Sequence, residues 1–225
     1  MARQGHGYSC LLMATLLSVN VGRAAASRYT DTGITGIDKR PATEPVALRD
    51  PGPGTGMSGA AGDAIGDPRS HGGTDQAVYA YAREDLDHWQ AELGRPLTNG
   101  VFGENLTTSG LDVSGALVGE RWQIGDACVL EVTSPRIPCR TFAGWLEEQL
   151  WVKRFTERGA PGAYLRVISP GTVAAGDEIT VLHRPAHLVT IAMMFRALTT
   201  DKALQPQLAA AGYALPEHLR RRLVP

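Results

Sequence analysis

Glycine and proline interrupt this chain at short intervals, and this punctuation limits its fold more than any other feature. The 225 residues include 26 glycines and 14 prolines. Both residue types occupy tight turns and are unfavourable inside helices and central strands. The sequence therefore favours a turn-rich, mainly β architecture with some helices, an α+β fold, over a helical bundle.

The runs between these residues predict both strands and helices. Residues 78–82 (VYAYA) indicate a strand, and residues 83–93 place three apolar side chains on one helical face. Residues 120–135 alternate in polarity around a Gly-Asp turn, which predicts a hairpin. Residues 146–159 predict a further helix, with Leu150 on its buried face.

Composition divides the chain into three parts. Residues 162–182 predict a second hairpin-like pair of strands, and the character then changes at HRPAH. Three short helical runs follow, each bounded by Thr, Pro or Gly. We therefore predict an N-terminal extension over residues 1–12, a main domain over 13–185 and a helical appendage over 186–225.

The first 26 residues allow two interpretations. An arginine, an apolar run and the stretch AAAS are typical of a secretory signal peptide. Residues 16–21 (LLSVNV) also read as a strand that enters a turn at Gly22, and Met13 is then a candidate start. Elsewhere nothing approaches the ~18 apolar residues of a membrane span, so no membrane partner is expected.

Charge and cysteine content exclude several classes of protein. The net charge of −1 gives no reason to expect nucleic acid or an acidic membrane as a partner. Three cysteines, an odd number, argue against a disulfide framework. Cys10 and Cys128 lie in apolar runs, whereas Cys139 lies between arginines and directly after a proline.

Cys139 is the most unusual of these thiols. Two nearby prolines deny its segment a regular strand ladder, and Arg136 and Arg140 place positive charge beside it. Positive charge favours the thiolate, which attacks electrophiles or binds soft metals. A loop cysteine with incidental arginine neighbours is the alternative, and local chemistry does not separate the two.

A second unusual stretch is SHGGTDQ. Gly72 and Gly73 allow the backbone to approach a ligand closely, while His71 and Asp75 supply polar groups and Arg69 a cation. A tight loop that leads into a strand would explain the glycines without any function.

Four segments together resemble a known family. HGGTDQAVYAY, FGENLTTSGL, SPRIPCRTF and GAYLRVISPGTVAAGDEI occur in this order and look like a MOSC domain, the module named for the C-terminal part of molybdenum-cofactor sulfurases. The resemblance runs from about residue 16 to 182. It implies a closed β-barrel, and the last segment is similar to the three-helix appendage of stand-alone bacterial members.

The activity implied by the resemblance is that of a molybdenum-dependent oxidoreductase. Such proteins bind a molybdenum cofactor (molybdopterin) and reduce small N-hydroxylated compounds, such as hydroxylaminopurines and amidoximes, with electrons from a separate donor protein. Two alternatives stand beside this one: a sulfur carrier with a persulfide on Cys139, and a non-catalytic barrel that binds a small anion.

The resemblance also assigns residues to roles. Cys139 falls on the family's metal-binding cysteine, and His71 and Glu104 are candidate proton donors. The HGG and FGEN loops line the pocket in the family, and the three arginines are added for their charge alone. The candidate cofactor-binding residues are therefore Arg69, His71, Gly72, Gly73, Glu104, Asn105, Arg136 and Arg140.

Three further expectations follow from the resemblance. Gln76 stands where many relatives carry lysine, so one cationic contact is expected to be missing. Pyridoxal phosphate is also associated with the wider family, but none of the three lysines lies in a recognisable site for it. The family's first strand coincides with residues 16–21, which favours a cytoplasmic protein over a secreted one with a signal in residues 1–26.

Overall fold

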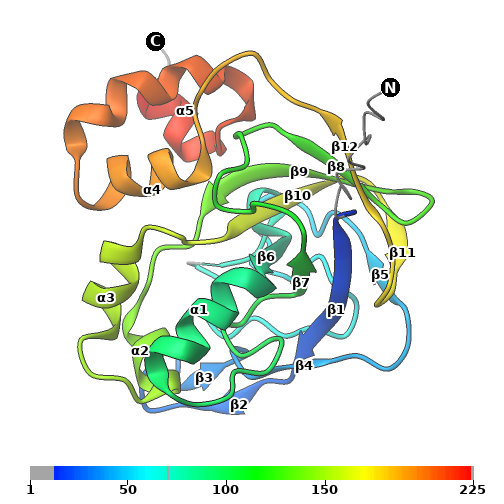
Figure 1. Cartoon of the computed structure of the whole chain (residues 1–225), viewed down its shortest axis with the longest axis vertical. Helices are drawn as coiled ribbons and strands as arrows, with labels where there is room; N and C mark the ends of the chain where they lie inside the picture. The colour runs from blue at the N-terminus through cyan, green and yellow to red at the C-terminus, as the bar shows by residue number, and fades with distance from the viewer. Residues whose placement is uncertain (1–12, 70, 224–225) are drawn as a thin grey trace, which may run out of the picture.

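The centre of the fold is an eight-stranded sheet in the order β12–β8–β9–β10–β6–β7–β1–β4. The computed structural model describes residues 13–69 and 71–223, and Figure 1 shows their arrangement. All neighbours in this sheet are antiparallel except β6 and β7, which are parallel and joined through α1. The strands are β1 (Thr15–Gly22), β4 (Lys39–Pro41), β6 (Val78–Ala82), β7 (Leu106–Ser109), β8 (Arg121–Ile124), β9 (Cys128–Pro135), β10 (Ala163–Ser169) and β12 (Ile179–His183).

The mixed α+β class is confirmed, but the predicted closed barrel is not found among the described residues. The order of hydrogen-bonded strands ends at β12 and β4. One isolated bridge, between Thr15 and Glu178, connects β1 to the residue before β12. Two small pairs complete the β structure: β2 (Ala25–Ala26) with β3 (Ile34–Thr35), and β5 (Val46–Leu48) with β11 (Gly171–Val173).

Two of the predicted hairpins have different outcomes. Residues 120–135 form the hairpin β8–β9, with the turn glycine Gly125 at a φ of 58°. The predicted pairing within residues 162–182 is wrong, because β10 pairs with β9 and β6 while β12 pairs with β8. Pro170 lacks the N–H that would continue the β10 ladder, and the chain then turns away to form β11.

Five α-helices are present in the described residues: α1 (Arg83–Leu93), α2 (Arg140–Leu146), α3 (Trp151–Arg158), α4 (Ile191–Thr199) and α5 (Glu217–Leu223). The prediction for α1 is confirmed, including its end at Gly94. The helix predicted over residues 146–159 is wrong in its first turn, because Glu147 and Leu150 adopt left-handed φ values of 57° and 55°. Leu150 is consequently 71% exposed rather than buried.

The C-terminal segment forms two α-helices rather than the predicted three. Between α4 and α5 lies η2 (Lys202–Ala214), a 3-10 segment that contains Pro206 and a non-helical Gly212. Pro206 lacks the N–H of a helical hydrogen bond, and the non-helical Gly212 interrupts the segment, so no continuous α-helix forms here. Figure 1 shows α4 and α5 grouped near the C-terminus.

The buried apolar side chains form two hydrophobic cores. One is built from the strands together with buried side chains of α4, η2 and α5. The other is aromatic and includes Trp89, Phe102, Phe142, Trp151 and Phe155. Partly buried Cys139 and Tyr164 pack against the aromatic core.

The N-terminal part of the chain is described from residue 13. Residues 16–21 lie in β1, so the strand prediction for LLSVNV is confirmed. The predicted extension over residues 1–12, with Cys10, lies outside the described residues. None of the helices described has the length and apolar character that crossing a bilayer requires.

Candidate functional site

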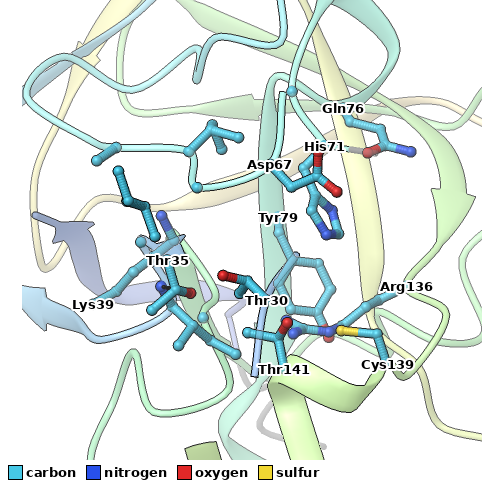
Figure 2. A pocket seen from close by; sticks show the side chains of 18 of the residues that line it. Thr30, Thr35, Lys39, Asp67, His71, Gln76, Tyr79, Arg136, Cys139 and Thr141 are labelled. Atoms are coloured by element: carbon cyan, nitrogen blue, oxygen red, sulfur yellow. Dashed lines mark hydrogen bonds between the residues drawn. The ribbon is translucent and has the colours of Figure 1, made fainter. Parts of the chain in front are cut away.

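A cavity of about 280 Å³ opens between the β2–β3 hairpin, the segment before β6 and the turn from β9 into α2. This volume is close to the lower end of small-molecule sites, which span roughly 300–1,000 Å³. Figure 2 shows Cys139 and Arg136 on one side of the cavity, Lys39 and Thr35 on the other, and His71 and Gln76 above them.

The HGG loop forms one wall because its glycines allow close backbone approach. Gly72 has a φ of 80°, and a Cβ placed there would lie 2.6 Å from the backbone of Gly56 and Met57. Gly73 has the same φ, and its N–H donates to the Met57 carbonyl at 2.9 Å. Gly72 lines the cavity, whereas Gly73 anchors the loop behind it.

Cys139 lies on the opposite wall, at the residue before α2. It is a free, half-buried thiol with an extended backbone, and it lines the cavity. The preceding prolines end the strand ladder, as predicted. The thiol is thus open to a ligand in the cavity.

Arg136 lies three residues before this thiol, and it is only 6% exposed. Its guanidinium lies over the Phe142 ring at 4.1 Å and the Tyr79 ring at 5.2 Å. One nitrogen donates to the Phe102 carbonyl, but Nε is buried without a hydrogen-bond partner. Among the described residues no carboxylate forms an ion pair with Arg136, so the cavity wall carries an uncompensated buried cation.

His71 also lines the cavity, with its Nδ1 3.4 Å from the Tyr164 hydroxyl. Burial lowers the pKa of His71 to about 4, and the Arg136 charge adds to this shift. In the ligand-free protein His71 therefore does not titrate near neutrality, as an ordinary histidine does. Its ring is neutral at pH 7.

Acidification is expected to destabilise the protein through His71. The unfolded histidine has a pKa of about 6.5 and therefore binds more protons than the folded form as the pH falls towards 4. The free energy of unfolding should fall with pH in this window by at most about 1.4 kcal/mol per pH unit, the slope for one proton. Urea unfolding between pH 7 and 4 should show a smaller loss for His71→Gln, whereas exposed His218→Gln should behave like wild type.

Glu104 does not reach the cavity, although it was predicted as a catalytic residue. Its carboxylate is fully buried and accepts hydrogen bonds from the Gly100 and Phe102 amides and the Thr107 hydroxyl, at 2.6, 3.0 and 2.9 Å. Burial raises the pKa of Glu104, and these hydrogen bonds oppose the shift. This carboxylate holds the FGEN turn.

Asn105, the next residue, does line the cavity. Its side-chain oxygen accepts from the Tyr79 amide at 3.1 Å, and its nitrogen donates to Asp63 at 2.9 Å. The oxygen and the nitrogen of this side-chain amide are thus both hydrogen-bonded within the protein. Asn105 shapes the wall between β6 and the Asp63 loop.

The two remaining arginines differ from Arg136. The Arg140 side chain lines the cavity mouth, is 68% exposed and pairs with Asp31 at 3.1 Å. Arg69 is 75% exposed, pairs with Asp67 at 3.5 Å and is not among the residues that line the cavity. Arg69 was selected as a cofactor-binding residue for its charge alone, and the structure places it away from the cavity.

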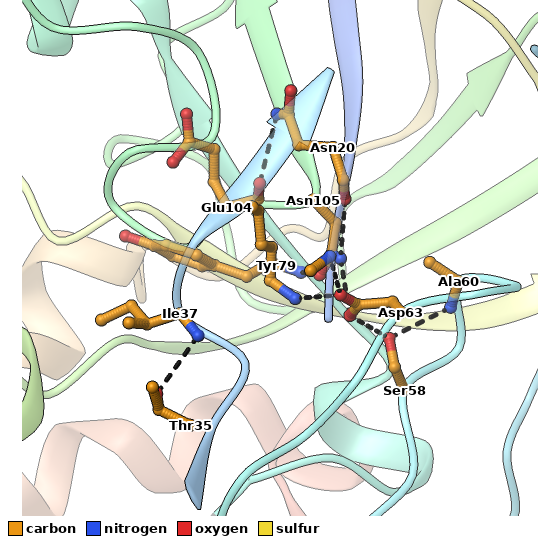
Figure 3. Close-up of polar contacts among 11 residues, drawn as sticks. Asn20, Thr35, Ile37, Ser58, Ala60, Asp63, Tyr79, Glu104 and Asn105 are labelled. Atoms are coloured by element: carbon orange, nitrogen blue, oxygen red, sulfur yellow. Dashed lines mark hydrogen bonds and ion pairs between the residues drawn. The ribbon is translucent and has the colours of Figure 1, made fainter. Parts of the chain in front are cut away.

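The sequence analysis did not select the buried pair of Lys39 and Asp63. Lys39 lines the cavity at 6% exposure, and its ammonium pairs with Asp63, whose side chain is fully buried. Asp63 also accepts from Ser58, Asn105 and the Gly22 amide at 2.6, 2.9 and 2.8 Å (Figure 3). Lys39 and Asp63 are 24 positions apart, and no local pattern in the sequence indicates that they meet.

Burial lowers the pKa of Lys39, and the Asp63 charge opposes that shift. Tyr79 and Tyr164, which the sequence analysis did not select, also line the cavity, as does Gln76. The Gln76 side-chain oxygen is buried without a hydrogen-bond partner. It is therefore available to a donor on a ligand.

Comparison with known proteins gives the family. The model of the MOSC domain matches residues 67–180, which include the HGG loop, Arg136 and Cys139. The chain belongs to the MOSC family. It is 35% identical over 171 residues to the uncharacterized protein YflK of Bacillus subtilis (strain 168), with 76% of this chain and 74% of that protein covered.

Two other relatives extend this comparison. A protein named Reductase from Gibberella moniliformis is 34% identical over 119 residues, which cover 51% of this MOSC protein and 21% of the fungal one. The crystal structure of YiiM from Geobacillus stearothermophilus superposes with a TM-score of 0.73 at 27% identity, covering 93% and 97% of the two chains. The resemblance derived from the sequence is thereby confirmed.

Proposed function

We propose that this protein binds a molybdenum cofactor and is the reductase component that acts on small N-hydroxylated compounds, such as hydroxylaminopurines or amidoximes. One observation carries the proposal: a half-buried thiol, Cys139, shares a cavity with the unpaired buried cation Arg136. A soft sulfur ligand suits molybdenum, and an uncompensated cation suits an anionic cofactor.

The residues present fit such a group. The cavity offers a free thiol, two buried cations and two buried polar atoms without a hydrogen-bond partner, on Arg136 and Gln76. A buried polar atom without a partner is costly, so a ligand that pairs with it binds favourably. Gly72 also lines the cavity, and its close approach to Gly56 and Met57 leaves no room for a side chain at this position.

Each wall residue has a distinct task in this proposal. Cys139 would hold the metal, Arg136 would balance the cofactor's negative charge, Lys39 would donate a hydrogen bond, and Gln76 would accept one. When bound, the cofactor supplies two-electron redox chemistry at molybdenum. His71 is neutral, so one ring nitrogen can donate a hydrogen bond to a substrate in the cavity and the other can accept one.

The relatives support this reading at a coarser level. The name of the Gibberella protein is Reductase. The match covers 21% of that protein, so its name supports a redox role in general and no particular substrate. The electrons would come from a separate donor protein, and we place the protein in the cytoplasm.

The activity test uses purified protein from a host that makes molybdenum cofactor. A chemically reduced viologen supplies electrons, and oxidation of the dye is followed on addition of benzamidoxime or 6-hydroxylaminopurine. Substrate-dependent oxidation that disappears in Cys139→Ser and persists in Cys128→Ala supports the proposal. A molybdenum-loaded protein that oxidises no dye with either class of substrate contradicts the reductase assignment.

A sulfur carrier is the second candidate, because the Cys139 thiol faces an open cavity. A persulfide on this residue would be detected by mass spectrometry as a reducible gain of one sulfur atom on the Cys139 peptide. Its presence on metal-free protein would favour this function over that of the reductase.

A further inference from the structure

The cavity loop and the C-terminal segment meet at the carboxylate of Asp75. This residue lies in η1 (Thr74–Gln76), the turn that follows the HGG loop. Its neighbours His71, Gly72, Gln76 and Ala77 line the cavity, but Asp75 does not. The side chain of Asp75 is thus attached to the cavity wall and directed elsewhere.

Both oxygens of the Asp75 carboxylate are used. Oδ2 accepts from the backbone N–H of Glu217, the first residue of α5, at 3.0 Å. Oδ1 accepts from Arg166 of β10 at 2.7 Å. The same Arg166 donates to the carbonyl of Ala214, the last residue of η2, at 3.3 Å and pairs with Glu131 at 3.0 Å.

This junction is well shielded from solvent. The Asp75 and Arg166 side chains are 29% and 16% exposed. On the other side of the turn, the Thr133 hydroxyl donates to the Asp75 carbonyl at 2.6 Å. Leu215 and Leu219 of the C-terminal segment are 1% and 3% exposed in the core shared with the sheet. The η1 turn is therefore held between β9, β10 and α5.

We propose that Asp75 is a positioning residue, which fixes η1 against Arg166 and the start of α5 so that the C-terminal segment sets the placement of Gln76 and the HGG loop. The consequence for the cofactor rests on the proposed function, whereas the coupling itself does not. The C-terminal helices thus have a role at the site without contacting it.

Amide hydrogen exchange on ligand-free protein tests the coupling directly. In Asp75→Asn one acceptor oxygen becomes an NH₂ group, so either Arg166 or the Glu217 amide loses its partner. We expect exchange in residues 71–77 and 216–223 to rise on the order of tenfold, as for the loss of one charge-assisted hydrogen bond. Exchange in β9 and β10 away from the junction should stay at the wild-type rate.

Glu217→Gln is the matched control. It removes the same charge at the same junction, but Glu217 contacts Asp75 through its backbone, and its side chain pairs with Arg221. Leu219→Ala is a second variant that tests the coupling, since it weakens the packing of α5 without altering Asp75 or the cavity. It should raise exchange in residues 71–77 as well.

The exchange rates in these three variants distinguish the proposed coupling from a general loss of stability. Faster exchange confined to the two segments in Asp75→Asn and Leu219→Ala, with Glu217→Gln unchanged, supports the coupling. Unchanged exchange in residues 71–77, or an equal rise throughout the sheet, overturns it. In cofactor-loaded protein the coupling also predicts faster pterin release from Asp75→Asn than from Glu217→Gln. A wild type that never loads molybdenum contradicts the proposed function and leaves the exchange result standing.

Discussion

Replacement of Asp63 by alanine is expected to lower the free energy of unfolding by about 3–5 kcal/mol. The Asp63 side chain is fully buried, and it compensates the ammonium of Lys39, which is itself 6% exposed. Its removal leaves a buried charge without a partner and also frees the donors of Ser58 and Asn105. Urea unfolding at pH 7 measures this change.

Asp38→Ala provides the matched control for that measurement. Asp38 also pairs with a cation, Arg40, but their side chains are 37% and 69% exposed. Exposed ion pairs contribute about 0–1 kcal/mol, so this variant should remain close to wild type. Combining Asp63→Ala with Lys39→Met should recover much of the loss, because the uncompensated charge is then gone. A loss below 1 kcal/mol in Asp63→Ala would contradict this description of the pair.

Arg136→Met is expected to raise the dissociation rate of the pterin from loaded protein by about 100-fold, the effect of losing a desolvated charge partner. Stability should change by less than about 1.5 kcal/mol, since an apolar side chain in place of a buried charge is often neutral or stabilising. Methionine also suits the aromatic surroundings of Phe142 and Tyr79. Pterin fluorescence after gel filtration measures the release.

The control for Arg136 is Arg140→Met at the cavity mouth. Arg140 is 68% exposed and already paired with Asp31, so its loss should change the release rate by less than about tenfold, as for a rim charge. Equal effects of the two substitutions would show that the cavity recognises charge in general. The buried position of Arg136 would then have no special role.

Local patterns in the sequence predicted the elements whose contacts are close along the chain. α1, the hairpin β8–β9 and β6 follow from apolar periodicity and from turn residues such as Gly125. Local patterns did not predict the pairing of β10, because its partners β6 and β9 depend on the arrangement of the whole sheet. The break between α2 and α3 was also missed, since left-handed Glu147 and Leu150 are not residues that usually mark it.

In the candidate site, too, the sequence predicted the residues that a local pattern marks and missed those that depend on distant segments. Cys139 stood out because arginines and prolines surround it, and the structure places it on the cavity with His71, Gly72, Asn105 and Arg136. Charge alone could not distinguish buried Arg136 from exposed Arg69, because burial depends on residues distant in sequence. The pairing of Lys39 with Asp63 across 24 positions had no local signal.

The central claim is that Cys139 holds molybdenum, and metal and pterin analysis of purified protein tests it most directly. Wild type and Cys139→Ser are compared with Cys128→Ala, which removes a thiol that is fully buried in β9 and whose pKa is raised by burial to about 11. We expect near-stoichiometric molybdenum in wild type and Cys128→Ala. Cys139→Ser should lose the metal and retain pterin on Arg136 and Lys39. Full molybdenum occupancy in Cys139→Ser would contradict the claim.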